Sequence, residues 1–156
     1  TSTGLMNACE DAIKKEKIDY QRNGTYVVME GPQFSTLAES NLYRSWKADV
    51  IGMTNMPEAK LAREAEMCYV SIAMVTDYDC WHKNHKEVSV EMVIKNLKIN
   101  TELANKIVYE TAKVISNERP ISESHKSLSN GLITSKENVS KETNSKVKIF
   151  TDKYWL

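Results

Sequence analysis

The sequence predicts an α/β fold with a mixed, largely parallel sheet flanked by helices. Short β-rich runs alternate along the chain with segments whose apolar residues recur at helical spacing. The third apolar run, "CYVSIAMV", carries no charge on either face, as expected of a central parallel strand covered by helices. Strands are therefore expected at 25–30, 48–53 and 68–75.

The intervening segments read as helices. A capping signature, Thr36 followed by Glu39, opens one of them. Pro57 stands in the first turn of the next, where proline is tolerated. The last is the longest, and Asn100 marks a place where it could be interrupted. The expected helices cover about 4–17, 35–46, 55–67 and 88–116.

After Pro120 the composition shifts to Ser, Lys, Asn and Glu, as in "SKENVSKETNSK". We expect an exposed helix or a loosely ordered tail there, whose charges form a solvated face. The expected division is 1–118 for the main part of the domain and 119–156 for a polar C-terminal helix or tail of the same domain.

The composition and charge of the chain argue against several classes of function. The 156 residues contain 21 Lys+Arg and 21 Asp+Glu, a balance that argues against nucleic acid or an acidic membrane as the main partner. No apolar run is long enough to span a bilayer. Three widely spaced cysteines suit a reduced compartment, so we expect a cytoplasmic protein. The chain opens on Thr1, and we expect a processed chain or a piece of a longer one.

Ligands in open parallel sheets bind beyond the carboxyl ends of the strands. The three expected strands lead into "EGPQFST", "MTNMPE" and "TDYDCWH", and two of these segments open helices, whose free N–H groups favour anions. The pattern predicts a pocket with an anion site near Thr54. Its candidate residues are Phe34, Ser35, Met53, Thr54, Asp77 and Asp79.

Each candidate also has a purely structural interpretation. The hydroxyl residues could cap helices, and Phe34 and Met53 could belong to the core. Asp77 could be a cap or an ion-pair partner. We favour a functional acid at Asp77, because it is paired with Asp79 and follows a long uncharged run.

Two other chemistries are weaker alternatives at the same place. Asp-x-Asp here lacks the Gly and distal Glu of a calcium loop, and His-x-x-His lies outside a helical pattern. A nucleophilic role for Cys80 lacks an identifiable base. We therefore expect no metal, although a metal set would use Asp77, Asp79, Cys80, His82 and His85.

Three blocks carry a resemblance to a known family: "GTYVVMEGPQFSTLAES", "DVIGMTNMPEAKLAREAEMCY" and "IAMVTDYDCWH". They closely resemble the C-terminal half of the S-methyl-5′-thioadenosine phosphorylases, within the trimeric purine nucleoside phosphorylase family. The match runs from about Gly24 to Val114 and is weaker on either side. It implies a nucleoside phosphorylase-like fold, of which this chain is only the C-terminal part.

The resemblance implies phosphorolysis of S-methyl-5′-thioadenosine to adenine and 5-methylthioribose 1-phosphate, in purine and methionine salvage. Phosphate would be the cosubstrate, with no metal or organic cofactor, and the enzyme would be a homotrimer. One alternative is a related phosphorylase acting on inosine, guanosine or adenosine. Another is a non-catalytic nucleoside-binding remnant.

The resemblance also implies residue roles. Phe34 would pack against the adenine, Met53 would line the ribose, and Thr54 would donate to phosphate. Ser35 and Val90 would set substrate selectivity. Substrate-binding residues would further include Asp77, Tyr78, Asp79, Val93 and Ile94.

The chemistry of the implied reaction explains why acids and apolar residues would be needed at these positions. Adenine leaves poorly as an anion, so a protonated Asp77 would donate to N7 as the C–N bond breaks. An ionised Asp79 would accept from the exocyclic amine, since a carboxylate only accepts. Val90, with Val93 and Ile94, would form an apolar wall suited to a methylthio group.

The family's N-terminal half contains a Gly-rich phosphate turn, an Arg-His pair that grips phosphate and a Thr-Ala segment near the sugar. No counterpart is visible here, because Gly4 and Gly24 have the wrong surroundings. A single threonine hydroxyl does not replace an arginine fork. We therefore expect the 156-residue chain alone to be inactive and unstable.

Overall fold

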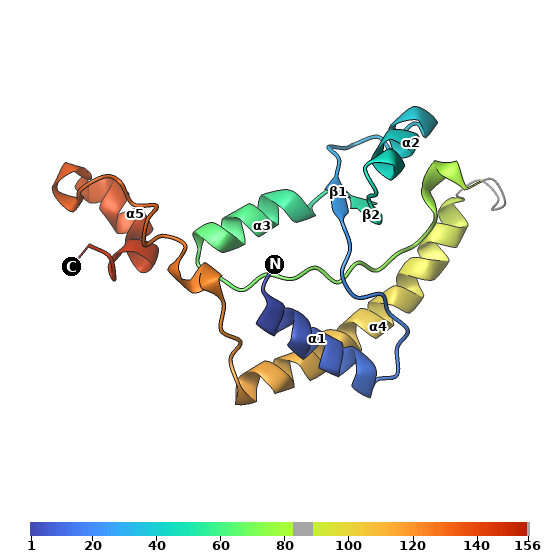
Figure 1. Cartoon of the computed structure of the whole chain (residues 1–156), viewed down its shortest axis with the longest axis horizontal. Helices are drawn as coiled ribbons and strands as arrows, with labels where there is room; N and C mark the ends of the chain where they lie inside the picture. The colour runs from blue at the N-terminus through green and yellow to red at the C-terminus, as the bar shows by residue number, and fades with distance from the viewer. Residues whose placement is uncertain (83–88, 156) are drawn as a thin grey trace.

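The computed structural model describes residues 1–82 and 89–155 (Figure 1). Its helices and strands, in chain order, are α1 (Thr3–Lys15), β1 (Tyr26–Val28), α2 (Leu37–Ser45), β2 (Val50–Gly52), α3 (Asn55–Glu64), α4 (Val90–Asn117) and α5 (Lys141–Thr151). Short 3-10 turns occur at η1 (Asp79–Trp81), η2 (Glu123–Lys126) and η3 (Lys136–Asn138). The order confirms an α/β chain.

The two strands pair in parallel, with Tyr26 opposite Val50 and Val28 opposite Gly52. Helix α2 forms the crossover between them, and its start is the expected capping box, in which Thr36 and Glu39 satisfy each other's backbone N–H groups. The parallel pairing puts the carboxyl ends of both strands at one edge, where the candidate residues follow.

The predicted strand over 68–75 is wrong. The described backbone there is extended but pairs with neither β1 nor β2. A β-strand forms only where a neighbouring strand accepts and donates its backbone hydrogen bonds. Other groups hold the segment instead. The Ser2 N–H donates to the Tyr69 carbonyl at 2.8 Å, and Val75 is 60% exposed.

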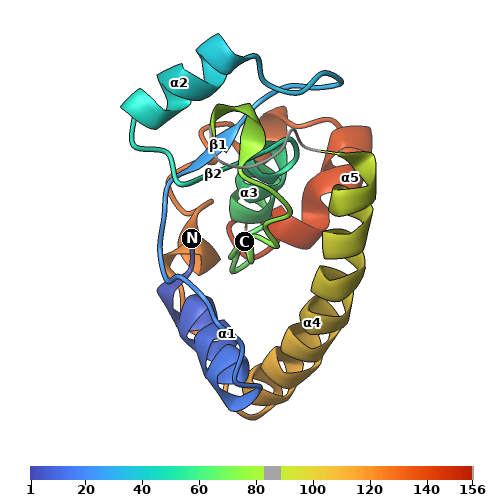
Figure 2. The same ribbon diagram turned by 90° about the vertical axis from the view of Figure 1, so that its right-hand side faces the viewer.

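Helix α1 packs on the C-terminal half of α4, where the two converge in Figure 2. The buried hydrophobic side chains of the described residues all lie on these two helices. Burying an isoleucine side chain, as at Ile13 and Ile107, stabilises the packing by about 1.5–3 kcal/mol, and the smaller side chains contribute less. The buried hydrophobic residues are Ala8, Cys9, Ala12, Ile13 and Ile107.

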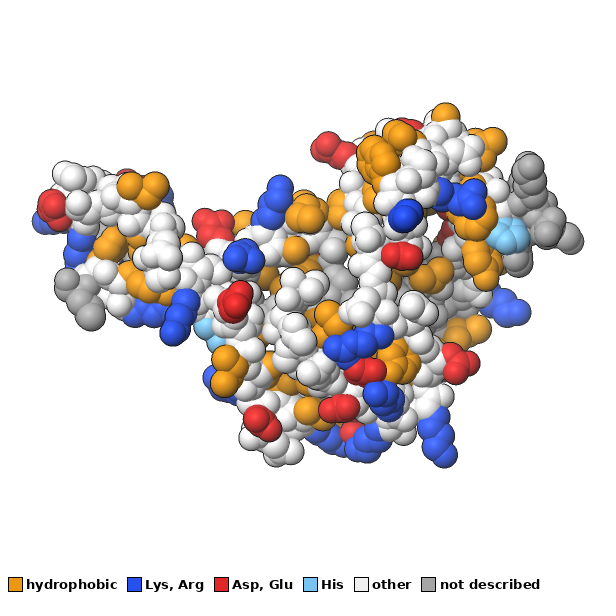
Figure 3. All heavy atoms as spheres, viewed as in Figure 1, with side chains coloured by type: hydrophobic (Ala, Val, Ile, Leu, Met, Phe, Trp, Pro, Cys, Tyr) orange, Lys and Arg blue, Asp and Glu red, His pale blue; other side chains and the backbone are white. Residues whose placement is uncertain are grey.

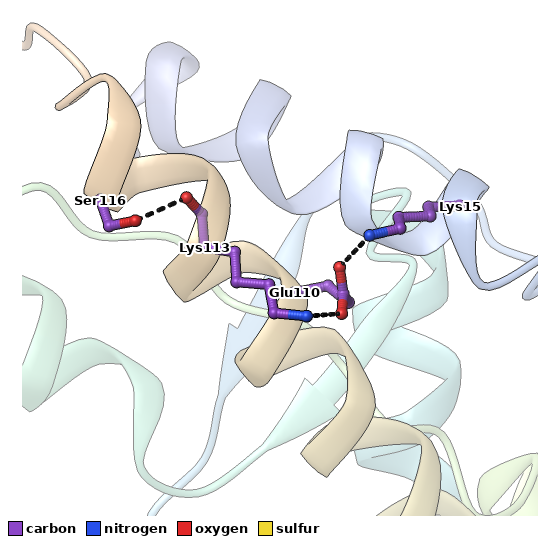
Figure 4. Close-up of polar contacts among 4 residues, drawn as sticks. All are labelled: Lys15, Glu110, Lys113 and Ser116. Carbon is purple, nitrogen blue, oxygen red and sulfur yellow. Dashed lines mark hydrogen bonds and ion pairs between the residues drawn. The ribbon is translucent and has the colours of Figure 1, made fainter.

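Glu110 ties the same two helices together (Figure 4). Its carboxylate accepts from Lys15, the last residue of α1, and from Lys113 at 2.7 Å. The hydrogen bonds from Lys113 and Lys15 outweigh burial and lower the pKa of Glu110. Ser116 donates back to the Lys113 carbonyl at 2.8 Å.

Helix α4 runs over 28 residues, so the suggested interruption near Asn100 is absent. The sequence predicted that this helix begins at residue 88. Residue 88 lies outside the described residues, and residue 89 is the N-cap of α4. None of the helices within residues 1–82 and 89–155 is both long and apolar enough to cross a membrane.

The polar C-terminal segment contains a capped helix rather than a loose tail. Ser140 caps α5 by accepting from the Thr143 N–H at 3.1 Å. Glu66, just beyond α3, accepts from the Leu128 N–H at 3.0 Å and also from Tyr154 and Lys153. These contacts fasten the chain after α4 to the end of α3. The division at residue 118 remains a prediction.

Candidate active site

The segments that follow the two strands are in contact. The ladder continues one step as the Met29 N–H donates to the Gly52 carbonyl at 2.9 Å. Beyond it, a Cβ atom on Gly31 would lie 3.1 Å from the Met53 sulfur. A larger residue at 31 would displace Met53, so Gly31 permits the close approach of these two segments.

The third polar segment joins the first through Ser35. The Ser35 hydroxyl donates to the Met29 sulfur at 3.3 Å, and its carbonyl accepts from the Cys80 thiol at 3.5 Å. Ser40, one turn into α2, is buried with 2% of its surface exposed. The start of α2 therefore packs against the loop that contains the aspartates.

Asp77 and Asp79 lie together in that loop. The Asp77 carboxylate accepts from the Asp79 N–H at 2.9 Å and from the Thr76 hydroxyl at 2.7 Å. Asp79 has a φ of 57°, in the left-handed region that few non-glycine residues occupy. Aspartate adopts this conformation more readily than most residues, and the hydrogen bond from its N–H to Asp77 holds the turn.

Helix α4 holds the loop through two asparagines that were not among the site residues predicted from the sequence. Asn96 Nδ2 donates to the Thr76 carbonyl at 2.5 Å, and Asn100 Nδ2 donates to the Val75 carbonyl at 2.9 Å. The two stand four residues apart, on one face of the helix. Two amides at this spacing in a long apolar pattern are a signal that could have identified them.

A cavity of about 310 Å³ opens beside the acids. It lies between α2, β2 and the extended segment that precedes the loop. This volume falls within the range of small-molecule sites. The predicted residues Asp77, Tyr78 and Asp79 line it, whereas Phe34, Met53 and Thr54 do not. The other lining residues are Tyr26, Ser40, Tyr43, Arg44, Ala48, Asp49, Val50, Ile51, Ala73, Met74, Val75, Thr76 and Trp81.

Arg44 and Trp81 form one wall of this cavity. The Arg44 guanidinium lies 3.8 Å from the centre of the Trp81 ring, a cation–π contact between α2 and η1. Trp81 in turn lies edge-on to Tyr78 with their ring centres 6.4 Å apart. Arg44 was not expected from the sequence, because a single arginine on a helix reads as a solvated charge.

Thr54 stands at the N-cap of α3 and is exposed, and its side chain makes no capping hydrogen bond. The next residue, Asn55, is engaged elsewhere: its Oδ1 accepts from the Tyr69 hydroxyl at 2.7 Å and from Ser71. The Thr54 hydroxyl and the first N–H groups of α3 can therefore donate to an anion.

The predicted apolar contacts lie at the surface. Phe34 is 83% exposed, and at the start of α4 Val90 is 69% and Ile94 48% exposed, with Val93 half-buried. Neither Phe34 nor the three α4 residues line the cavity.

Residues 1–113 match the family model described as the phosphorylase superfamily.

The chain belongs to the phosphorylase superfamily.

Curated members of the superfamily with similar sequences are named S-methyl-5′-thioadenosine phosphorylases. The protein from Prochlorococcus marinus is 55% identical over 155 residues, which is 99% of this chain and 49% of that protein. The protein from Thermosynechococcus vestitus is 53% identical over 150 residues, 96% of this chain and 52% of that protein. The similarity therefore extends beyond the predicted limits at Gly24 and Val114.

Solved structures of the superfamily share the fold. A methylthioadenosine phosphorylase from an antarctic soil metagenomic library matches with a TM-score of 0.80 and 44% identity, covering 94% of this chain and 50% of that one. Methylthioadenosine phosphorylase from Schistosoma mansoni, solved in complex with adenine, matches with a TM-score of 0.67 and 31% identity, covering 73% and 46%. The chain thus spans about half the length of these relatives.

The metal and nucleophile alternatives both concern the loop that contains Asp77 and Asp79. Among residues 1–82 and 89–155, no three His, Cys, Asp or Glu side chains are grouped to hold a metal, and His85 lies outside the described residues. Burial and the charge of Asp79 raise the pKa of the Cys80 thiol, which opposes a nucleophilic role.

Proposed function

We propose that the complete protein cleaves S-methyl-5′-thioadenosine with inorganic phosphate, releasing adenine and 5-methylthioribose 1-phosphate. The names of the relatives, S-methyl-5′-thioadenosine phosphorylases, support this substrate. The observation that carries the proposal is the Asp77–Asp79 loop, because contacts with α2 and α4 hold both acids in one turn. The proposed setting is purine and methionine salvage in the cytoplasm, with no metal or organic cofactor.

In the proposed reaction a phosphate oxygen attacks C1′ as the bond from C1′ to N9 breaks. The bonding electrons leave with the base, and a protonated Asp77 gives its proton to N7. Asp79 accepts from the exocyclic amine, and Tyr78 contacts the substrate between the two acids. A 6-oxopurine has an acceptor in place of that amine, so the acid pair discriminates against it.

The other predicted residues are proposed to contact the base, the ribose, the phosphate and the methylthio group. Phe34 packs against the base, Met53 lines the ribose, and Thr54 donates to phosphate from the α3 N-cap. Ser35 sets base selectivity beside the loop that it contacts. The apolar residues for the methylthio group are Val90, Val93 and Ile94.

The exposed apolar surface supports a larger assembly. Figure 3 shows hydrophobic side chains on the surface over α2, where Leu37, Leu42 and Trp46 are each about half exposed, at 56%, 47% and 60%. Surfaces of this kind are usually covered by further protein. We propose that the rest of the protein and neighbouring copies in a homotrimer cover them and complete the phosphate site.

The test is adenine release by the complete protein from S-methyl-5′-thioadenosine, with inosine as the matched substrate and with phosphate omitted as a control. We expect release that requires phosphate and a large preference for the methylthio substrate. Equal turnover of inosine would favour a related phosphorylase with another nucleoside substrate.

The chain spans about half the length of its relatives, which favours a second candidate function for these residues alone. This second function is nucleoside binding without catalysis. Residues 1–156 alone should release no adenine. Phosphate-dependent release by the purified fragment would contradict this expectation.

A further inference from the structure

Cys68 and His125 meet although they are 57 residues apart in the chain. The Cys68 sulfur lies 3.2 Å from His125 Nε2 and 3.7 Å from the Pro120 carbonyl oxygen. Cys68 begins the extended segment before the acid loop, and His125 lies in η2. The pair is remote from the cavity and has no part in the proposed phosphorolysis.

The other two cysteines have different surroundings. Cys9 is 6% exposed between α1 and α4, and burial raises the pKa of its thiol. Cys80 is exposed but donates to the Ser35 carbonyl, and burial and Asp79 raise the pKa of its thiol. The Cys68 thiol also donates to a backbone carbonyl, that of Pro120. It differs in having the His125 imidazole nitrogen beside its sulfur as well, and an imidazole nitrogen can remove the proton, whereas a carbonyl oxygen can only accept a hydrogen bond.

We propose that Cys68 and His125 form a reactive thiol site that exchanges with small disulfides such as glutathione disulfide. A thiol within hydrogen-bond reach of a histidine is the arrangement that activates sulfur nucleophiles. The ligand class is a low-molecular-weight disulfide, which needs only an accessible sulfur in line with its S–S bond.

The step balances without a further oxidant. His125 Nε2 takes the Cys68 proton as the sulfur attacks one sulfur of the disulfide. The S–S bond breaks, its electrons leave with the second sulfur, and that thiolate receives the proton from His125. The products are a mixed disulfide on Cys68 and one free small thiol.

A lysine from the end of the chain holds the backbone of the histidine. Lys153 Nζ donates to the His125 carbonyl at 3.3 Å, which fixes the backbone of η2. Lys153 also pairs with Glu66, so that this carboxylate is already engaged. The departing proton therefore has a fixed acceptor in His125 and no competing free carboxylate at Glu66.

The first experiment uses the three cysteines of one protein as mutual controls. The complete protein is exposed briefly to glutathione disulfide near neutral pH and quenched with acid, and its peptides containing Cys9, Cys68 and Cys80 are quantified by mass spectrometry. We expect Cys68 to be modified about tenfold faster than Cys80, although Cys80 is the more exposed. Equal rates, or faster modification of Cys80, would overturn the proposal.

A matched pair of variants assigns the effect to the histidine. His125→Gln should slow modification of Cys68 about tenfold and leave Cys80 unchanged, while Cys80→Ser should leave the Cys68 rate unchanged. In denaturant the modification rates of Cys68 and Cys80 in the wild-type protein should become equal. This result would show that the folded structure causes the faster modification of Cys68. A folded His125→Gln protein with an unchanged Cys68 rate would refute the site. If that variant does not fold, the order of the wild-type rates decides.

Discussion

The Asp77 carboxylate accepts a hydrogen bond from the backbone N–H of Asp79 at 2.9 Å. This bond closes a turn that places the Asp79 backbone in the left-handed region, with φ at 57°. The two acids therefore fix one another's position, and substitutions must separate this effect from the proposed contacts with a ligand.

Asp77→Asn tests the acid. Asparagine keeps the size and an accepting oxygen for the Asp79 N–H, but it has no acidic proton to give. We expect turnover of S-methyl-5′-thioadenosine by the complete protein to fall by about 10²–10⁴. Asp11→Asn, at an exposed position on α1, is the control. Unchanged turnover would remove Asp77 from the proposed role.

Asp79→Asn separates charge from backbone conformation. Asparagine tolerates a positive φ nearly as well as aspartate, so the turn should persist. Its amide can no longer offer a carboxylate to the amine, and a hydrogen bond to a charged group contributes about 1.5–3 kcal/mol. We expect KM for the methylthio substrate to rise by about tenfold to a hundredfold. Wild-type KM would mean that Asp79 does not contact the base.

Arg44→Met should loosen the acid loop. Methionine keeps the apolar stem but lacks the cation that stacks on Trp81, a contact that contributes about 0.5–2 kcal/mol. We expect a stability loss in this range and a shift of tryptophan fluorescence. Arg63→Met, on the exposed side of α3, should change neither. Identical fluorescence in both variants would show that Arg44 does not position the loop.

Glu66 makes the attachment of the C-terminal segment depend on pH. Burial raises the pKa of Glu66, but hydrogen bonds from Lys153, Tyr154 and the Leu128 N–H outweigh it and lower the pKa from 4.5 to about 2. A depressed carboxyl pKa stabilises the fold above the unfolded-state pKa, and the contribution is lost as pH falls through 4.5 toward 2.

Glu66→Gln should therefore lower the free energy of unfolding by about 2 kcal/mol at pH 6. The difference from wild type should shrink as pH falls below about 4. Glu142→Gln is the control, because its pair with Lys146 is exposed on both sides, at 79% and 71%, and contributes less than about 0.5 kcal/mol. Urea unfolding at several pH values measures both. A difference that grows on acidification would contradict the sign.

Val90→His tests the methylthio pocket. Histidine can bond a 5′-hydroxyl, whereas valine offers only apolar contact. We expect the ratio of kcat/KM for adenosine over S-methyl-5′-thioadenosine to rise. Ile99→His, at another exposed position of α4, should leave the ratio unchanged. A wild-type ratio in the Val90 variant would place the residue outside the pocket.

Local patterns predicted the elements that depend on local interactions. The capping box at Thr36 and the apolar face of α1 depend on neighbouring residues, and both are observed. The strand at 68–75 failed because pairing requires a partner strand, which local sequence does not supply. The interruption at Asn100 failed because that side chain bonds Val75 rather than its own helix.

The site was predictable only where one segment contains the chemistry. Asp77 and Asp79 stand two residues apart, and the structure places them together beside a cavity. Arg44 and Asn96 act across long separations, so their roles emerged only once the loop had been placed against α2 and α4.

The most direct test of the account is a structure of the complete protein with adenine bound. The account predicts the Asp77 carboxyl within about 3 Å of N7 and the Asp79 carboxylate at the same distance from the exocyclic amine. Acids turned away from the base, or coordinating a cation, would contradict it.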